Sequence, residues 1–516
     1  MHIAIRVDAS VQIGTGHLMR CLTLANQIKI LNGEVVFICR HLPDSLATLV
    51  EQNGHTVRRL LPVTLTNTTD LVDSDSNENL PSHAHWLHAT WQQDAYATKE
   101  VLSEFGELEY LVIDHYALDA RWESALRPYV SKIMVIDDLA DRQHDCDLLL
   151  DQNYYVDQET RYANKLNANT TTLLGPKFAL LRPEFSRAKN EMPEDKRNAV
   201  DVKRLNICFG GIDATGEILK TLDALEPQFA ETNLQVDIVM GNAAPHISLV
   251  QERIKKYNNI HLHIAPPNLA QLMATADLGI GAAGSMSWER ASLGLPSIAI
   301  ALADNQLRLG IDAAQLGLHL FLGHYSQVTT EKIRTAFTIM LDNCYLRQSF
   351  SMRSGLIVDD KGKERVAKYL VKPKISLRLC QESDCLMVYQ WRNAEINRLN
   401  SHQTGDISYT THEAWFLSSL NRQDRYLLIG GDTSGDLGVL RYDKYPDYWM
   451  TSVYLVPGRH GHGLGDAFLK AGLDWMNSQC GSSCHIRAEI KSNNAASHAV
   501  FKKAGYSPIF TTYTVM

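Results

Sequence analysis

The chain has 516 residues, of which 45% are hydrophobic and 21% are charged, and its formal net charge is −8. At roughly 100–200 residues for each folded unit, this length predicts about three units rather than one core. The net negative charge excludes the basic footprint that nucleic acid or an acidic membrane surface requires, so we expect small metabolites as partners, no nucleic acid and no membrane.

The sequence also bears on location and metal content. No apolar run approaches the roughly 20 residues that span a bilayer, and the first residues do not form a basic segment followed by an apolar one. We therefore expect a cytoplasmic protein. Among the nine cysteines, Cys480 and Cys484 lie close together in a turn-like setting. Without a second cluster or spaced histidines nearby, we expect reduced thiols and no metal site.

The first twenty residues contain a strand, a polar turn and a helix. An apolar strand over His2–Val7 precedes a turn with Gly14 and Gly16, and His17 stands at the N-terminus of the apolar-periodic helix that follows. Glycines let backbone N–H groups approach an anion, and a histidine exchanges a proton near neutral pH. The turn is therefore a candidate site for chemistry on a phosphorylated substrate; the alternative is a strand-to-helix turn with a capping histidine.

Strands and helices alternate from residue 1 to about residue 190. The strand-like segments are His2–Val7, Glu34–Cys39, Tyr110–Asp114, Lys132–Asp137 and Asp147–Asp151. This alternation predicts an α/β fold with a doubly wound parallel sheet, in which ligands bind beyond the carboxyl ends of the strands. Asp8, Asp114-His115-Tyr116 and Asp137-Asp138 follow three of these strands, and each aspartate either caps a loop or belongs to a site. The polar stretch from Asp70 to Ser82 is typical of an exposed loop.

A charged, proline-containing linker around residues 190–204 separates this lobe, residues 1–195, from a second alternating unit, residues 200–365. Its strand-like segments are Leu205–Phe209, Gln235–Met240, Leu278–Ile280 and Ser297–Ala301. The small residues of Gly281–Ser285 precede a helix and form a candidate phosphate cradle. Glu289 in that helix either accepts hydrogen bonds from a ribose diol or is a solvated glutamate. Two such lobes facing each other across a cleft suit a sugar nucleotide.

Several separated motifs of residues 1 to about 365 resemble one family. They are the turn from Arg6 to Arg20, Asp114-His115-Tyr116, Val135 to Ala140, Leu174 to Phe185, and Gly210-Gly211-Ile212-Asp213. Together they resemble the UDP-2,4-diacetamido-2,4,6-trideoxy-β-L-altropyranose hydrolases of pseudaminic acid biosynthesis, which are related to the GT-B glycosyltransferases. The resemblance implies two Rossmann-like lobes with a UDP-sugar between them.

The resemblance further implies that UDP binds at Gly281–Ser285 and Glu289, and that water attacks the anomeric carbon with His17 as general base. Asp8 or Asp114 would orient His17 or contact the sugar. The residues expected around the UDP-sugar are Gly14, Gly16, Arg20, His115, Tyr116, Gly210, Gly211, Gly284, Ser285, Glu289, Asn305 and Gln306. The sequence departs from the family after Gly-Gly-x-Asp, where Asp213-Ala214-Thr215-Gly216 replaces a turn with proline and Asn/Thr, and this leaves a ligand contact from that turn in question.

A different pattern occupies residues 375–516, where strands follow one another. They are Ser376–Leu379, Tyr426–Gly430, Gly438–Asp443, Trp449–Val456 and His485–Ile490. The glycine-rich turn before the helix at Gly465 would by itself be an ordinary turn. Together with the segment from Asn493 to Tyr506, it resembles the GNAT N-acetyltransferases, an α+β fold. The resemblance implies acetyl-CoA as co-substrate, held by Val453, Leu455, Arg459, His460, Gly461, Gly463, Gly465 and Asn494.

This region departs from the GNAT pattern at two positions. His460, with Arg459 just before it, stands where a glutamine or arginine usually opens the pyrophosphate motif, and both side chains could meet phosphate. Phe501 stands where a tyrosine often protonates the leaving thiolate, so Tyr506, Tyr454 or water would have to supply that proton. A sugar amine needs only a weak base, and Glu489, beside the splayed strands, is a candidate.

Aromatic segments near the start of this region, Trp391–Asn393 and His412–Phe416, stand where GNAT folds build the acceptor pocket, or they are plain core. They resemble the acetyltransferase that acts on the UDP-linked 4-amino sugar of the same pathway. We therefore hypothesise a bifunctional enzyme that acetylates a UDP-linked amino sugar and hydrolyses the product to UDP and free sugar. The alternatives are a GT-B glycosyltransferase with an accessory acetyltransferase or a ligand-binding GNAT domain, and a binding protein without turnover.

Overall fold

The computed structural model describes residues 2–10, 12–61, 80–231, 233–371, 375–401, 403–432, 435–460, 464–480, 484–492 and 494–509. The chain divides into two compact units, Met1–Val371 and Lys372–Met516. Most of the exposed loop expected between Asp70 and Ser82 lies outside the described residues. Across the described segments, no helix has the length and apolar character needed to cross a membrane.

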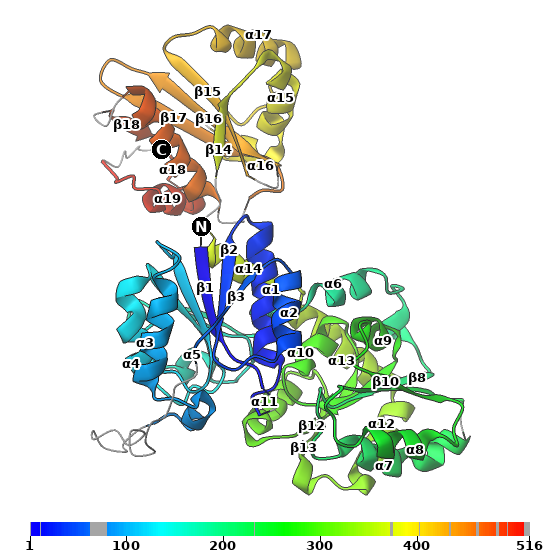
Figure 1. Cartoon of the computed structure of the whole chain (residues 1–516). Coiled ribbons are helices and arrows are strands. Elements are labelled where there is room, and N and C mark those ends of the chain that lie inside the picture. The colour runs from blue at the N-terminus through cyan, green and yellow to red at the C-terminus, as the bar shows by residue number, and fades with distance from the viewer. Residues whose placement is uncertain are drawn as a thin grey trace. The chain divides into compact units, whose positions relative to one another are not determined.

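The first lobe is built on a parallel sheet of seven strands in the order β3-β2-β1-β4-β5-β6-β7 (Figure 1). The strands are β1 (His2–Val7), β2 (Glu34–Cys39), β3 (Thr56–Arg59), β4 (Tyr110–Asp114), β5 (Lys132–Ile136), β6 (Leu148–Asp151) and β7 (Thr171–Leu174). The sequence missed β3 and β7, which are short edge strands with little apolar signal. The strand order reverses between β1 and β4, and the crevice at such a point is where open α/β sheets bind ligands.

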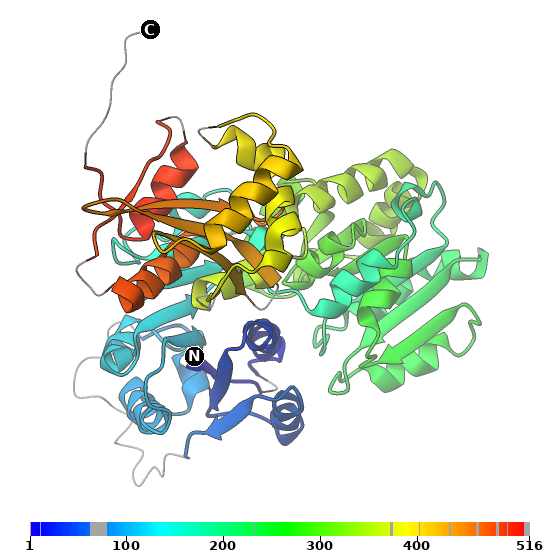
Figure 2. The same ribbon diagram turned by 90° about the horizontal axis from the view of Figure 1, so that it is seen from above.

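Helices cover both faces of this sheet, as Figure 2 shows. On one face, α1 (Gly16–Ile30) and α2 (Asp44–Gln52) pack on alternate residues of the central strands, such as Ile5 and Val112. On the other face lie α3 (Trp91–Leu102) and α4 (Ala120–Leu126), which pack on the intervening residues. Because both faces are buried, the strands are almost continuously apolar. The N-terminus of α1 therefore opens directly at the crevice between β1 and β4.

The second lobe repeats this plan with six parallel strands in the order β10-β9-β8-β11-β12-β13. The strands are β8 (Arg204–Cys208), β9 (Gln235–Met240), β10 (Ile260–Ile264), β11 (Leu278–Ala282), β12 (Ser297–Ala301) and β13 (Leu320–His324). The helices between and after them are α7 (Glu217–Glu231), α8 (Ile247–Ile254), α9 (Leu269–Thr275), α10 (Met286–Ser292), α11 (Asp304–Gln315), α12 (Thr330–Asp342) and α13 (Cys344–Ile357). The predicted pair of doubly wound lobes is confirmed.

The two lobes exchange helices. Helix α6 (Pro183–Asn190) follows the first sheet in sequence but packs on the second lobe, where Phe185 is buried against Met273 and its neighbours. Helix α14 (Gly362–Leu370) follows the second sheet but packs on α1, with Val366 and Leu370 in the core of the first lobe. The sequence predicted each lobe as one continuous segment, residues 1–195 and 200–365. These bounds stay predictions, and neither of them includes the helix exchange.

The C-terminal unit has a five-stranded sheet in the order β14-β15-β16-β17-β18. The strands are β14 (Ser376–Leu379), β15 (Arg425–Asp432), β16 (Gly435–Lys444), β17 (Trp449–Leu455) and β18 (Ile486–Ala488). All neighbours are antiparallel except β17 and β18. One face is covered by α18 (Gly465–Cys480) and α19 (Ala495–Lys503), and the other by α15 (Cys385–Asn393) and α17 (Tyr409–Leu420), with α16 (Glu395–Leu399) after α15.

The exchanged helix α14 yields a stability prediction. Leu370 is 2% exposed in the first-lobe core, so Leu370→Ala is expected to lower the free energy of unfolding by about 2–5 kcal/mol, measured by urea unfolding of the full chain. Lys368→Ala, on the exposed side of the same helix, is the matched control and should change it little. Equal effects of the two substitutions would contradict a packing role for α14.

Candidate functional site

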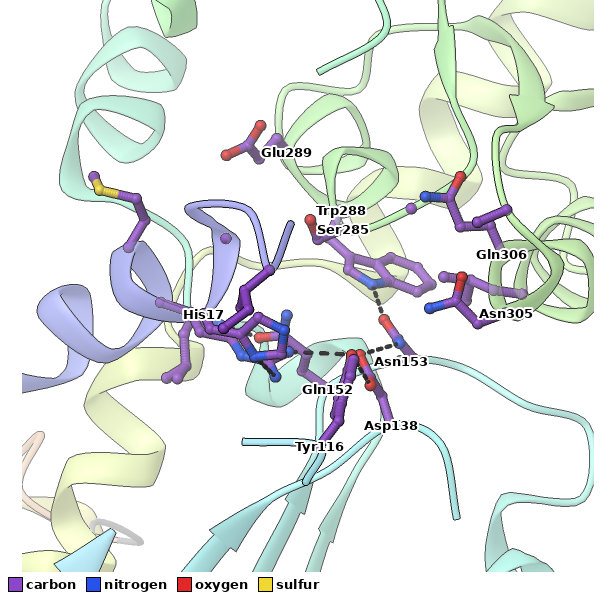
Figure 3. Close-up of a pocket in the computed structure, with 18 of the residues that line it drawn as sticks. His17, Tyr116, Asp138, Gln152, Asn153, Ser285, Trp288, Glu289, Asn305 and Gln306 are labelled. Carbon is purple, nitrogen blue, oxygen red and sulfur yellow. Dashed lines mark hydrogen bonds and ion pairs between the residues drawn. The ribbon is translucent and has the colours of Figure 1, made fainter. Parts of the chain in front are cut away.

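A cavity of about 490 Å³ lies between the two lobes of the N-terminal unit (Figure 3). Its first-lobe wall comes from the start of α1 and from the loops after β4, β5 and β6, and its second-lobe wall comes from α10 and α11. Nine of the residues expected at the UDP-sugar or at the reaction line it: Gly16, His17, Arg20, Tyr116, Gly284, Ser285, Glu289, Asn305 and Gln306. The cavity thus joins the carboxyl ends of the two parallel sheets.

His17 is oriented by a buried carboxylate. Its Nδ1 lies 2.6 Å from Oδ1 of Asp114 at the end of β4. Asp114 also accepts two 2.6 Å hydrogen bonds from the guanidinium of Arg20, one turn further along α1. Burial by itself would raise the pKa of Asp114, but the charges of Arg20 and His17 hold it well below its usual range. Since the Asp114 anion only accepts, His17 donates through Nδ1–H and keeps Nε2 as a proton acceptor.

Tyr116 and Asp138 support the other side of this group. The Tyr116 ring meets His17 edge to face, with centroids 4.6 Å apart and an interplanar angle of 83°. Its hydroxyl donates to Oδ1 of Asp138 at 2.5 Å, and a terminal nitrogen of Arg20 lies 3.5 Å from Oδ2 of Asp138. Burial and the Asp138 carboxylate raise the pKa of Tyr116 well above its usual value, so the hydroxyl remains a donor.

Asp8 and His115 lie in a different cluster. Asp8 is fully buried and pairs with Arg6 at 2.7 Å, while Nε2 of His115 lies 3.2 Å from its second oxygen. The backbone N–H of Arg40 also donates to Asp8, which ties the end of β1 to the end of β2. The sequence left Asp8 and Asp114 open as the partner of His17, and the structure places Asp114 there. Neither Asp8 nor His115 lines the cavity, so a direct contact with the sugar is not supported for either.

Three glycines expected at the ligand form turns outside the cavity lining. Gly14, with φ 82°, donates its N–H to the carbonyl of Ser10. Gly210, with φ 95°, and Gly211 follow β8, and Asp213 accepts the first N–H groups of α7 through its side chain. The positive φ values explain the glycines at 14 and 210 without any ligand, because other residues rarely adopt them.

The second-lobe wall is polar and partly paired. Ser285 is exposed at the start of α10, and Glu289 accepts a 3.1 Å hydrogen bond from Arg182. Burial raises the pKa of Glu289, and Arg182 opposes that rise. Asn305 is exposed at the start of α11, while Oε1 of Gln306 accepts from the backbone of the loop before it.

The sequence did not single out several residues of the cavity, namely Trp86, Gln152, Asn153, Arg182 and Trp288. Gln152 and Asn153 directly follow β6, so the search for polar residues at strand ends could have found them. Asp138 was noted at a strand end but not assigned. No pattern in the sequence marks Trp86 or Trp288, because only the packed lobes bring them to the cavity.

In the C-terminal unit, β17 has an open edge beyond the paired part of β18. The N–H of Trp449 donates toward β18, to the carbonyl of His485 at 2.8 Å. Because backbone N–H groups alternate along a strand, those of Val453 and Leu455 point to the same side. Pairing with β18 ends at Thr451, so within the described segments these two N–H groups have no β18 partner. This is where the sequence expected the thioester and pantetheine of acetyl-CoA.

The residues around the expected pyrophosphate site have contacts within the protein. Arg459 forms a 2.5 Å ion pair with Asp432. Nε2 of His460 lies 3.2 Å from Oδ1 of Asn397, and burial lowers the pKa of His460. Asn397 also donates to the carbonyl of Leu455, so it links the turn to the end of β17. Direct phosphate contacts of Arg459 and His460 remain predictions.

The remaining acetyl-CoA residues divide into described and undescribed ones. Gly465 begins α18, and a Cβ there would lie 3.0 Å from Val500, so glycine serves the close approach of α18 and α19. Asn494 caps α19 by accepting from the N–H of Ser497. Gly461 and Gly463 lie outside the described residues. Their expected roles are therefore predictions.

The candidates for proton transfer in this unit occupy three environments. Glu489 is exposed and directly follows β18. Phe501 is 7% exposed in the core, and Tyr506 packs against it edge to face with centroids 5.0 Å apart. Tyr454 lies among the apolar residues beneath α15 and α17, and burial raises its pKa. Tyr506 therefore lies next to Phe501, which has no hydroxyl with which to donate a proton.

The aromatic segments expected at an acceptor pocket are largely core. Phe416 is fully buried and His412 is 3% exposed, and their rings stack with centroids 5.7 Å apart. Trp391 and Trp415 are partly buried against the same cluster. Within the described parts of the chain, no three His, Cys, Asp or Glu side chains converge on a point that could hold a metal ion.

Comparisons with known proteins match this arrangement in two parts. The model of the acetyltransferase (GNAT) domain family matches residues 374–507. For the N-terminal unit, MurG of Acinetobacter baumannii superposes with a TM-score of 0.50 at 14% identity, over 72% of this chain and 99% of that one. The predicted fold, two GT-B-like lobes followed by a GNAT domain, is confirmed.

Relatives in sequence agree with the motifs. The UDP-2,4-diacetamido-2,4,6-trideoxy-β-L-altropyranose hydrolase of Campylobacter jejuni is 26% identical over 59% of this chain and 93% of its own length. The spore coat polysaccharide biosynthesis protein SpsG of Bacillus subtilis is 24% identical over 72% and 98%. An uncharacterized protein of Methanocaldococcus jannaschii is 22% identical over 98% and 96%, so it is similar to both units. The predicted resemblance to the hydrolase family joined to a GNAT domain is confirmed.

The Asp114 cluster yields a prediction about protonation. Arg20→Gln removes the charge that does most to lower the pKa of Asp114. Burial then opposes the carboxylate with only His17 left to balance it, so the pKa of Asp114 is expected to rise. NMR titration of the Asp114 carboxyl carbon measures this rise. Arg253→Gln, which breaks a surface ion pair of the second lobe, is the control and should leave the Asp114 signal unchanged.

Proposed function

We propose that the interlobe cavity hydrolyses a UDP-linked 2,4-diacetamido-2,4,6-trideoxyhexose to UDP and the free sugar. The observation that carries this proposal is the orientation of His17, whose Nδ1–H is held by Asp114 while its Nε2 remains an acceptor on the cavity. A water at Nε2 gives up a proton as its oxygen attacks the anomeric carbon. The bond from that carbon to the β-phosphate oxygen breaks, and UDP leaves with the electron pair.

Asp114 and Arg20 have distinct parts in this step. The imidazolium that forms on His17 is stabilised by the Asp114 anion at 2.6 Å. Arg20 donates two further hydrogen bonds to the same carboxylate, so the charge of Asp114 is shared between the two side chains. Arg20 thus holds Asp114 in the position from which it orients His17.

The nucleotide is assigned to the second-lobe wall, across the cavity from His17. Ser285, Glu289, Asn305 and Gln306 are the polar residues that line this wall, and they come from α10 and α11. The similarity to the hydrolase of Campylobacter jejuni supports a nucleoside-diphosphate sugar as the ligand. Glu289 has one oxygen bound to Arg182, which leaves the other for a ribose hydroxyl.

We further propose that the C-terminal unit transfers an acetyl group from acetyl-CoA to the 4-amino group of the UDP-linked precursor. The family match supports acetyl-CoA as the donor. The amine attacks the thioester carbonyl, whose developing charge is met by the N–H of Val453 at the open edge of β17. The C–S bond breaks, the amine loses a proton to water or Glu489, and the thiolate gains one from Tyr506, Tyr454 or water.

The two proposed reactions belong to one sequence. Acetylation converts the amino sugar nucleotide into the diacetamido compound that the first site hydrolyses. A bifunctional chain in pseudaminic or related nonulosonic acid synthesis follows from this order, and the similarity of the archaeal relative to both units supports their pairing.

His17→Ala tests the hydrolase site. UDP release from the UDP-diacetamido sugar should fall by at least about 100-fold, because the water loses its base, while release of CoA persists. His261→Ala, an exposed histidine on β10, is the control and should retain both activities. Retention of UDP release by His17→Ala would remove His17 from this role. UDP release by wild-type protein only after addition of a sugar acceptor would indicate a glycosyltransferase instead.

Val453→Pro tests the acetyltransferase site. Proline removes the N–H that points to the open edge of β17 without removing a hydrogen bond to β16, so CoA release should fall about 100-fold or more. Val453→Ala keeps the N–H and is the matched control, and both variants should hydrolyse the UDP-diacetamido sugar normally. If wild-type protein releases no CoA from acetyl-CoA and the UDP-4-amino sugar, the acetyltransferase proposal is wrong.

A further inference from the structure

A hydrogen bond between two residues of the cavity wall joins the two lobes. Trp288 lies on α10, three residues after Ser285, and is fully buried although it forms part of the cavity wall. Its indole Nε1–H donates to Oδ1 of Asn153, after β6 of the first lobe, at 2.8 Å (Figure 3). An indole nitrogen can only donate, so this bond fixes the Asn153 amide with its oxygen toward the second lobe.

The Asn153 amide passes this orientation on to the first lobe. With its oxygen toward Trp288, its Nδ2 faces Asp138 and donates to Oδ2 at 3.2 Å. The reversed amide would place an oxygen against the Asp138 carboxylate, which is repulsive. Asp138 in turn accepts the hydroxyl of Tyr116 and lies 3.5 Å from Arg20. Figure 3 shows Trp288, Asn153, Asp138 and Tyr116 as a row of neighbouring side chains in the lining of the cavity, with dashed lines from Trp288 to Asn153 and from Asn153 to Asp138.

The row ends at the proposed base. Tyr116 meets the His17 ring edge to face at 4.6 Å, and Arg20 holds the Asp114 carboxylate that orients His17. Asp138 thus fixes two of the groups that set the position and charge of His17. It is itself fixed from the second lobe through Asn153.

We propose that Trp288 and Asn153 are positioning residues, which align the His17 site with the helix of the second lobe that carries the nucleotide. This inference rests on the proposed hydrolase function. Since Ser285 directly precedes α10 and Trp288 and Glu289 lie on it, a nucleotide bound there fixes the indole, and the indole fixes Asp138 through Asn153. The His17 site and the nucleotide-binding wall are then correctly aligned for the reaction only when every hydrogen bond of this row is formed.

Another contact between the lobes provides a control, because it tests whether holding the two lobes together is enough for activity. Arg308 of α11 pairs with Asp157 of the first lobe at 2.5 Å, and both side chains are about half exposed. This pair joins the same two lobes, and within the described residues no hydrogen bond or ion pair of either side chain reaches Asp138, Asn153 or His17. Breaking the pair weakens the interface but leaves the hydrogen bonds of the row in place.

Steady-state hydrolysis by four variants tests the proposal. Trp288→Phe keeps a buried ring but removes the indole N–H that donates to Asn153. Asn153→Leu removes both the accepting oxygen and the donating nitrogen of the side-chain amide while keeping a similar volume. Each is expected to lower kcat roughly tenfold with little change in KM or in UDP affinity by calorimetry, because binding is kept and alignment is lost. The double variant should be no slower than Asn153→Leu, because both changes break one row. Arg308→Gln should retain the wild-type kcat.

Three results would overturn the proposal. They are a loss of kcat in Arg308→Gln equal to that in Trp288→Phe, effects of Trp288→Phe and Asn153→Leu that multiply in the double variant, and a rise in KM alone. Thermal unfolding of each variant separates misfolding from misalignment. Hydrolysis by wild-type protein together with any of these results rejects only the positioning role, whereas an inactive wild-type protein rejects the proposed hydrolase function as well.

Discussion

The buried carboxylate of Asp114 is the group on which the N-terminal site depends. It stands at the end of β4, where the strand order reverses, and it is excluded from water. A buried anion is costly unless charged donors surround it, and α1 supplies both of them, His17 and Arg20. The helix is therefore tied to the neighbouring strand at its N-terminal turn. The same contacts that stabilise the fold here leave one nitrogen of His17 available to the cavity.

The two lobes are joined by more than the linker between them. Helices α6 and α14 each directly follow the sheet of one lobe but pack on the other lobe, so each lobe completes the core of the other. A further apolar cluster contains Tyr155 of the first lobe and Trp288 of the second. With the lobes held in this way, a cavity formed by both of them has a defined geometry. The Trp288–Asn153 hydrogen bond adds direction to this contact, which apolar packing does not supply.

The C-terminal unit uses a different device to expose backbone donors. A strand within a sheet normally gives its N–H groups to both neighbours, so donors for a ligand require a place where pairing stops. Here β17 and β18 separate after Thr451, and Val453 and Leu455 continue along β16 alone. Phe501 removes the usual hydroxyl from the neighbouring helix, and Tyr506 lies directly against it. The proposed chemistry therefore depends on charged side chains in the N-terminal unit and on backbone N–H groups in the C-terminal unit.

By itself the sequence determined the fold class, most of the central strands, and the residue types at the strand ends. This was possible because buried parallel strands require continuous apolar runs, and because glycine turns followed by helices mark their carboxyl ends. It could not decide between Asp8 and Asp114, since both follow central strands and both are buried. Only the tertiary structure decided that Asp8 serves Arg6 and His115 while Asp114 serves His17. The exchange of α6 and α14 and the meeting of Trp288 with Asn153, 135 residues apart, were likewise settled by packing. Local patterns record which side chains a segment buries, but not which distant surface it is buried against.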